Sequence, residues 1–167
     1  MGNTTRTDAK PIGASDMASD MANHMATPAL TLKELLERLR LEFPEAGNAV
    51  GEYEIEALWR GGCRLRQCYD KRALRPGGTL SGATMMALGD FAMYLAVLSA
   101  VGWVPLAVTT NLTINFLRKP PARDLIAEAR LIKLGKQLAV GEVAIRADGG
   151  DDMVAHVTST YAIPPQR

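Results

Sequence analysis

The side chain most able to do chemistry in this sequence is that of Asp90, which lies in the middle of an otherwise apolar run. The run extends from Thr79 to about Val101, and Leu88 and Phe91 lie close to the carboxylate. An ionised carboxylate buried there loses its hydration, so it must be partnered, exposed at an interface or protonated. Such a group suits a general base or a nucleophile. The structural alternative is an aspartate that only hydrogen-bonds loop backbone.

Three glycines, Gly77, Gly78 and Gly82, lie near the expected start of this run. If a helix begins there, its first backbone N–H groups lack intrahelical acceptors and, together with the helix dipole, can bind an oxyanion. The alternative is that these glycines only shape a turn. Gly82 precedes Asp90 by about two helical turns, so we expect both residues to line one groove. A carboxylate and an oxyanion donor together suit the attack of water on an acyl carbonyl.

The other nucleophiles and metal ligands are poorly placed for catalysis. Cys63 and Cys68 fall on opposite faces of an expected strand, which disfavours a disulfide, and no histidine lies nearby to complete a zinc site. His24 lies near the N-terminus, and His156 alternates with threonines as a surface strand residue does. Ser81 lacks the sequence context of a nucleophile elbow. We therefore expect no metal, no cofactor and two reduced cysteines, as in a cytoplasmic protein.

The segments that must position Asp90 mostly have the pattern of strands. Thr31 and Glu34 have the spacing of a capping box, which predicts a helix that begins at Thr31 and stops at Pro44. The expected strands are Tyr53–Trp59, Cys63–Tyr69, Ala107–Leu117, Leu125–Leu134, Leu138–Ala147 and Met153–Ile163. Short glycine-containing turns join several successive strands, and this predicts an antiparallel meander.

Two of these segments bear directly on the site. Ala107–Leu117 alternates regularly, which predicts that Thr109 faces away from Leu112 and Ile114. The run 79–101 is apolar nearly all round and long enough to cross a membrane, so it is either a buried helix or a membrane span. An acidic residue at its centre is costly in lipid, and the amphipathic strands need a core to cover. We therefore predict a buried helix and no contact with a membrane.

These elements predict an α+β domain in which a curved antiparallel sheet wraps around a long central helix. Residues 1–28 have no sustained apolar pattern and are expected to form a flexible N-terminal arm, followed by one domain over 29–167 with a leading helix. An exposed edge or face of such a sheet favours dimerisation. A net charge of +1 and 5% aromatic residues argue against a nucleic-acid-binding surface.

Four segments together resemble one known family. They are GTLSGATMMALGD (78–90), VTTNLTINFLRKP (108–120), ARLIKLGKQLAVGEVAI (129–145) and MVAHVTSTYAI (153–163). In order and spacing they are similar to PaaI-like acyl-CoA thioesterases of the hotdog superfamily, whose signature reads GTLHGG, a short apolar run and then Asp. The resemblance covers about Tyr53 to Ile163. It implies the hotdog fold, hydrolysis of an acyl-CoA substrate, and a homodimer that can pair into a homotetramer.

The resemblance also implies roles for individual residues. Asp90 matches the catalytic acidic residue of the family, and Gly82 matches the glycine whose N–H polarises the thioester carbonyl. Thr109 matches a hydroxyl position that the partner subunit can bring to the site. Arg75 stands where many members carry Asn or Gln, and with Gly78 it is expected to contact the substrate.

The signature departs from the family at two positions. Ser81 stands in place of the usual His, and Ala83, a further expected substrate contact, stands in place of the second Gly. Ser81 can supply part of the role of that His as a helix cap. Arg118, Lys119 and Lys136 are either contacts for the CoA phosphates or solvated strand ends. The missing His leaves open a non-catalytic acyl-CoA-binding protein, and a purely structural oligomerising domain is a third class.

Overall fold

A six-stranded antiparallel sheet dominates the computed structural model, which describes residues 27–45 and 51–165. The strands of this sheet are β1 (Tyr53–Trp59), β2 (Gly62–Gln67), β5 (Val108–Phe116), β6 (Leu125–Leu134), β7 (Leu138–Ala147) and β8 (Met153–Ala162). The remaining elements are the helices α2 (Leu32–Glu42) and α4 (Gly82–Val101), the short 3-10 helix η1 (Lys71–Ala73), and a two-stranded sheet of β3 (Leu74–Arg75) and β4 (Thr79–Leu80). The predicted arm, residues 1–28, lies outside the described residues except for its last two.

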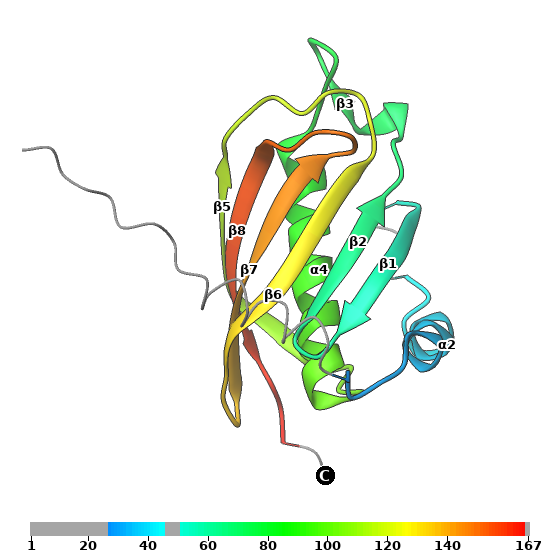
Figure 1. Cartoon of the computed structure of the whole chain (residues 1–167), viewed down its shortest axis with the longest axis vertical. Helices are drawn as coiled ribbons and strands as arrows, with labels where there is room; N and C mark the ends of the chain where they lie inside the picture. Colours follow the sequence, from blue (N-terminus) through cyan, green and yellow to red (C-terminus); the bar gives the residue numbers. More distant parts are fainter. Residues whose placement is uncertain (1–26, 46–50, 166–167) are drawn as a thin grey trace, which may run out of the picture.

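The sheet curves around α4, which lies along its concave face and contacts all six strands (Figure 1). Every residue of this helix from Phe91 to Ala100 is buried. By length and composition α4 would pass for a membrane span, but 72% of its apolar window is buried inside the molecule. The prediction of a buried core helix wrapped by a curved sheet is therefore confirmed.

The strand order departs from the predicted meander at β5. The order across the sheet is β1-β2-β6-β7-β8-β5, so β6, β7 and β8 follow one another as hairpins while β5 lies at the edge beside β8. The segment 117–124 carries the chain from β5 across the end of the sheet to β6 (Figure 1). This segment contains Pro120 and Pro121 and is longer than a tight hairpin turn, so β5 is not constrained to pair with β6. The predicted meander is wrong for this strand.

A β-bulge changes the faces predicted for β5. Thr109 lies opposite Tyr161 of β8, but the next paired residue is Asn111, opposite Thr160, so the register shifts between them. One extra residue in the strand reverses the alternation after it. Thr109 therefore shares the inner face with Leu112 and Ile114, which pack against the core. The expectation that Thr109 faces away from them is wrong because regular alternation does not reveal a bulge.

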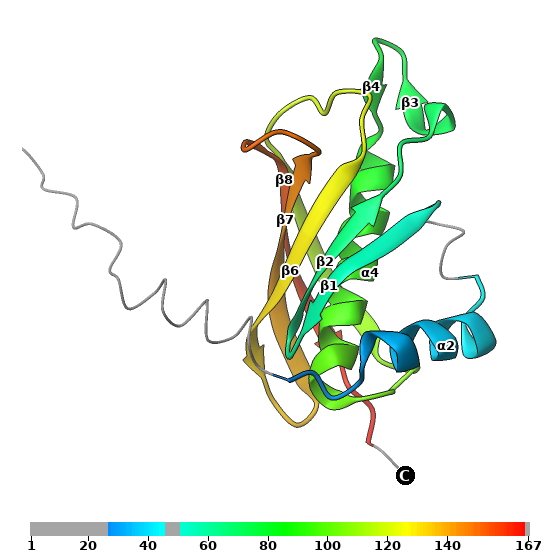
Figure 2. The same ribbon diagram turned by 45° about the vertical axis from the view of Figure 1, so that its right-hand side comes forward.

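Helix α2 begins at the predicted capping box. The Thr31 hydroxyl accepts a hydrogen bond from the N–H of Glu34 at 3.2 Å, and the Glu34 carboxylate accepts one from the N–H of Thr31 at 2.8 Å. Leu35 and Leu39 are buried in the core, and the helix crosses beside β1 (Figure 2). The packing of α2 brings its C-terminal cap residue, Phe43, against Tyr94 of α4.

Candidate active site

The carboxylate of Asp90 is held by two hydroxyl groups from the neighbouring edge of the sheet. Its Oδ1 accepts a hydrogen bond from Thr109 Oγ1 at 2.5 Å and another from Tyr161 Oη at 2.8 Å. The Tyr161 hydroxyl also lies 2.9 Å from the backbone carbonyl oxygen of Asp90. Oδ2 accepts no hydrogen bond from the described part of the chain. The carboxylate is therefore fixed through one oxygen and can offer the other to water or a substrate.

Two local features of the backbone make this arrangement possible. At Gly89, a Cβ atom would lie 2.8 Å from Cγ2 of Val157, so only glycine lets α4 approach β8 this closely. The close approach brings the neighbouring Asp90 within reach of Tyr161 on the same strand. The bulge in β5 turns Thr109 toward the helix from the other side. Asp90 is thus partnered, which was one of the three states expected for it.

Tyr161 is a site residue that sequence reasoning missed. Its side chain is buried, and this burial, followed by the charge of Asp90, raises the pKa of Tyr161 well above its ordinary value. The hydroxyl therefore stays protonated near neutral pH and donates a hydrogen bond to the carboxylate of Asp90. The alternation of Val157, Ser159 and Tyr161 could have marked an inward-facing tyrosine. Only the pairing of β5 with β8 shows that it meets Thr109 and Asp90.

Removal of the Tyr161 hydroxyl tests its role. We expect Tyr161→Phe to lower kcat/KM for the chain's substrate by about tenfold to hundredfold, because a hydrogen bond to a charged group contributes roughly 1.5–3 kcal/mol. Steady-state rates and the pH profile of the variant would be compared with those of Tyr69→Phe, which removes a half-exposed hydroxyl away from Asp90. Equal rates and pH profiles for Tyr161→Phe and the wild type would contradict a positioning role.

Asp90 lies in the wall of an apolar groove of about 650 Å³ between α4 and β5. This volume is within the usual range of small-molecule sites. The lining residues are Phe43, Ala83, Met86, Ala87, Asp90, Phe91, Tyr94, Pro105, Ala107, Val108, Thr109, Leu112 and Tyr161. Asp90 is the charged residue of this set, and the others offer mainly aliphatic and aromatic surface. The groove suits an apolar group whose reactive end lies beside a carboxylate.

The N-terminus of α4 offers unpaired backbone donors. Ser81 is its N-cap: its hydroxyl accepts a hydrogen bond from the N–H of Thr84 at 3.1 Å. The N–H of Ser81 donates to the carbonyl of Ala73 at 3.0 Å. Of the first four N–H groups of the helix, those of Gly82 and Ala83 have no acceptor among the described residues. They are available to an oxyanion, and the helix dipole strengthens them.

Within a single chain, Gly82 and Asp90 lie too far apart to contact the same carbonyl group of a substrate. Their separation along α4 corresponds to a rise of about 12 Å. Ala83 lines the groove, but Gly82 packs on Phe116, whose Cζ would lie 2.9 Å from a Cβ atom at residue 82. An oxyanion donor and an attacking group must both lie within about 3–3.5 Å of the same carbonyl. The groove lining includes Ala83 but not Gly82, so the predicted groove shared by Gly82 and Asp90 is not found in the described chain.

The other predicted contact residues lie at both ends of the sheet. Arg75 and Gly78 form the β3–β4 turn, where the N–H of Gly78 donates to the Arg75 carbonyl at 3.1 Å. Arg118 follows β5, and its N–H bonds the carbonyl of Val154 at the start of β8. Lys119 is the next residue and is exposed. The β3–β4 hairpin and the segment that follows β5 lie near the end of the sheet at which α4 begins (Figure 1).

Lys136 lies at the opposite end of the molecule. It belongs to the turn between β6 and β7, where the carbonyl of Gln137 accepts a hydrogen bond from the N–H of Ile163 after β8. The length of β8 puts this turn about 30 Å from the beginning of the strand. Within one chain, Lys136 therefore cannot contact the same phosphate as Arg118 and Lys119.

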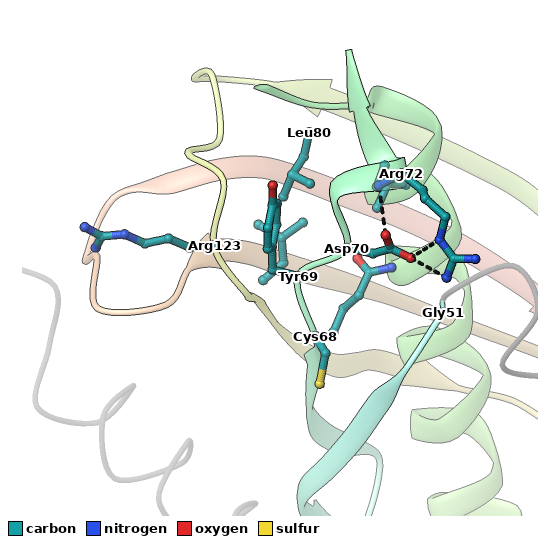
Figure 3. A pocket seen from close by; sticks show the side chains of 11 residues that line it. Gly51, Cys68, Tyr69, Asp70, Arg72, Leu80 and Arg123 are labelled. Carbon is teal, nitrogen blue, oxygen red and sulfur yellow. Dashed lines mark hydrogen bonds and ion pairs between the residues drawn. The ribbon is translucent and has the colours of Figure 1, made fainter. Parts of the chain in front are cut away.

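A second, more polar hollow of about 350 Å³ lies beside the start of α4 but contains none of the groups around Asp90 (Figure 3). Its carboxylate, Asp70, accepts hydrogen bonds from the backbone N–H and the side-chain Nε of Arg72, at 2.8 and 2.6 Å. Arg123 points away from this pair (Figure 3). Because both carboxylate oxygens of Asp70 accept hydrogen bonds from Arg72, this hollow offers no carboxylate oxygen comparable to Oδ2 of Asp90.

The environments of the two cysteines disfavour their thiolate forms. Complete burial raises the pKa of the Cys63 thiol to about 12, and its Sγ lies 3.4 Å from the carbonyl oxygen of Ala92. Burial, followed by the charge of Glu52, also raises the pKa of Cys68. Both cysteines are free thiols. In residues 27–45 and 51–165, no three His, Cys, Asp or Glu side chains gather as metal ligands.

Sequence and structure comparisons converge on one family. Residues 77–154 match the family model of the thioesterase superfamily. A Saccharolobus solfataricus protein to which an esterase activity is ascribed is 32% identical over 143 residues, or 86% of this chain and 92% of that protein. The crystal structure of a Silicibacter sp. TM1040 protein, to which a thioesterase activity is ascribed, has 43% identity and a TM-score of 0.73, covering 83% of this chain and 94% of that chain.

A third relative was solved with a ligand. The structure with coenzyme A of a Streptococcus pneumoniae TIGR4 protein, to which a thioesterase activity is also ascribed, has 25% identity and a TM-score of 0.69, covering 77% of this chain and 98% of that chain. The wrapped helix and these similarities confirm the predicted hotdog fold. The PaaI-like resemblance is confirmed by the structure of a Ralstonia eutropha JMP134 phenylacetic acid degradation-related protein, which has 26% identity and a TM-score of 0.66, covering 76% of this chain and 98% of that chain. This chain belongs to the thioesterase superfamily.

Proposed function

We propose that this protein hydrolyses acyl-CoA thioesters to a free acid and CoA. The observation that carries the proposal is the carboxylate of Asp90, held through Oδ1 by Thr109 and Tyr161 in the wall of an apolar groove. Membership of the thioesterase superfamily supports a thioester as the bond that is cleaved. The coenzyme A in the Streptococcus pneumoniae structure supports CoA as the thiol part of the substrate.

The reaction needs a nucleophile, an oxyanion site and a leaving thiolate. Asp90 either takes a proton from the water that attacks the acyl carbonyl or attacks that carbon itself. The negative charge that develops on the carbonyl oxygen is stabilised by the N–H groups of Gly82 and Ala83. In the general-base route, the C–S bond then breaks, the sulfur leaves with the bonding electrons and takes the proton that Asp90 removed from water, and the acid is released. In the covalent route, the sulfur leaves with the bonding electrons as the acyl-Asp90 anhydride forms, and it takes up a proton from solvent. In the covalent route, water hydrolyses the acyl-Asp90 anhydride in a second step.

We place each reacting carbonyl between two copies of the chain. The rise of about 12 Å between Gly82 and Asp90 supports an assembly in which the oxyanion donors of one protomer face the Asp90 of the other. The edge strand β5 favours this assembly, because one side of its backbone pairs with no other described strand and Val108, Phe116 and Leu117 are half exposed. Thr109 reaches the Asp90 of its own chain, so a partner's hydroxyl is not needed to hold that carboxylate.

The first test is the release of free thiol from a panel of acyl-CoAs, followed with a thiol reagent. Turnover of at least one substrate is expected and would identify the acyl preference. Tight binding of acyl-CoA without thiol release would instead support the non-catalytic binding protein. The observation that favours this alternative is Ser81, which stands where the family signature has a histidine. Its hydroxyl caps α4 by bonding Thr84.

Mixing two inactive variants tests the shared site. Chains with Asp90→Asn and chains with Gly82→Pro would be coexpressed with different tags, and the mixed dimer purified. If each site uses Gly82 of one chain and Asp90 of the other, one of the two sites in a mixed dimer is intact. We expect the mixed dimer to recover about half of the wild-type rate, as two-fold symmetry dictates. No recovery above the separate variants would show that both groups act from one chain.

A further inference from the structure

We propose that Phe43, at the end of α2, forms the end wall of the acyl pocket and limits the length of the acyl group that the protein accepts. This inference rests on the proposed function, because it assigns the groove beside Asp90 to the acyl part of a thioester. Phe43 lies outside the segment 77–154 that matches the thioesterase superfamily. It is the residue through which the N-terminal part of the described chain reaches the groove. The predicted ligands are short and medium-length acyl groups.

A series of aromatic rings connects Phe43 to the carboxylate. The ring of Phe43 meets that of Tyr94 edge-on, with centroids 6.0 Å apart and an interplanar angle of 86°. Tyr94 lies 6.4 Å from the ring of Tyr161, which bonds Asp90. Tyr94 is buried, and its hydroxyl lies 3.3 Å from the carbonyl oxygen of Pro105. Phe43 thus rests on a fixed ring within the lining of the groove.

The end of α2 is itself anchored. Leu35 and Leu39 are buried in the core, and the N–H of Phe43 donates to the Leu39 carbonyl at 2.9 Å. Glu42, the residue before Phe43, accepts a hydrogen bond from Trp103 Nε1 at 2.8 Å. The guanidinium of Arg38 lies over the Trp103 ring and pairs with Glu42. These contacts hold the helix to the loop that follows α4, so Phe43 acts as a wall.

The distribution of charge indicates which way an acyl group extends from Asp90. The β3–β4 hairpin and the segment after β5, which carry the exposed cations Arg75, Arg118 and Lys119, lie near the end of the sheet at which α4 begins, where a phosphate-bearing group remains in solvent. In the opposite direction, the groove is lined by Phe91, Tyr94 and Phe43 without a charged side chain. The apolar tail therefore extends toward Phe43. The rise along α4 from Asp90 to Tyr94 is about 6 Å, so the space before the wall is short.

Substitutions at residue 43 test the wall in both directions. With saturated acyl-CoAs from butanoyl to hexadecanoyl, Phe43→Ala is expected to move the optimum of kcat/KM to longer chains. Each extra methylene buried should favour binding about fourfold. Phe43→Trp is expected to move the optimum to shorter chains. Leu41→Ala is the matched control, because Leu41 lies on the same helix with 74% of its surface exposed and does not line the groove.

A binding measurement separates the wall from the chemistry. Dissociation constants of the same acyl-CoAs would be measured by calorimetry in the Asp90→Asn background, with and without Phe43→Ala. A shift toward longer chains in binding, even if the wild type releases no thiol, would support the wall while the proposed hydrolysis fails. Thiol release with unchanged chain-length profiles in both residue 43 variants would overturn the wall and leave hydrolysis standing. An equal shift in Leu41→Ala would also overturn it, as would the absence of acyl-CoA binding.

Discussion

Replacing Asp90 with asparagine is expected to lower kcat by about 10²–10⁴-fold, the range attributed to a positioned general base. The amide differs from the carboxylate in charge and basicity but hardly in shape. Its oxygen can still accept the hydrogen bonds from Thr109 and Tyr161, so α4 and β8 should pack as before. The loss should therefore appear in turnover, with little change in stability or in the affinity for acyl-CoA.

Thiol release, acyl-CoA affinity and the free energy of unfolding would be measured side by side for this variant. Asp151→Asn is the matched control, because it makes the same chemical change at an exposed position in the turn between β7 and β8. Undiminished turnover by Asp90→Asn would reject Asp90 as the central catalytic group. A large loss of stability would show instead that the carboxylate serves mainly to hold the helix against the sheet.

Local patterns predicted most of the elements of this fold. The apolar run around Asp90 predicted the central helix because few other environments accommodate such a surface. The capping box of Thr31 and Glu34 marked the start of α2, and alternation located the strands to within one or two residues at most ends. Each of these signals comes from the residues of the element itself and needs no knowledge of which other elements it packs against.

The arrangement around Asp90 depended on non-local geometry. The pairing of β5 with β8 joins segments separated by two strands, and nothing in the alternation of either segment selects the partner. The bulge that turns Thr109 inward does not alter the alternation of polar and apolar residues in the sequence, so that alternation does not reveal the bulge. Tyr161 was therefore missed, and Thr109 was placed on the wrong face. The close approach at Gly89 likewise becomes visible only when Val157 lies against it.

The separation of Gly82 from Asp90 follows from helix geometry and is readable from the sequence alone. Two turns of helix keep two residues near one face, yet they also place them about 12 Å apart. A substrate carbonyl needs its oxyanion donor and its attacking group at contact distance. The sequence therefore contains the parts of the proposed site together with a reason to divide them between two chains.

Replacing Gly82 with proline is expected to lower kcat by about 10²–10³-fold, the loss found when one oxyanion donor is removed. Proline deletes the backbone N–H, and Gly82 is the first residue of α4, a position at which proline is favourable. The preceding Ser81 is extended, with φ −75° and ψ 151°, as a residue before proline should be. The variant should therefore fold normally and lose one donor.

Gly82→Ala is the comparison that isolates the amide. It keeps the N–H and adds the same Cβ, which would lie 2.9 Å from Cζ of Phe116, a half-exposed ring that can shift aside. Single-turnover rates of thiol release should fall far more in Gly82→Pro than in Gly82→Ala. Equal losses would assign the effect to the added carbon rather than to the donor. Wild-type rates in Gly82→Pro would mean that the amide of Ala83 alone stabilises the oxyanion, so that the N-terminus of α4 works through one donor.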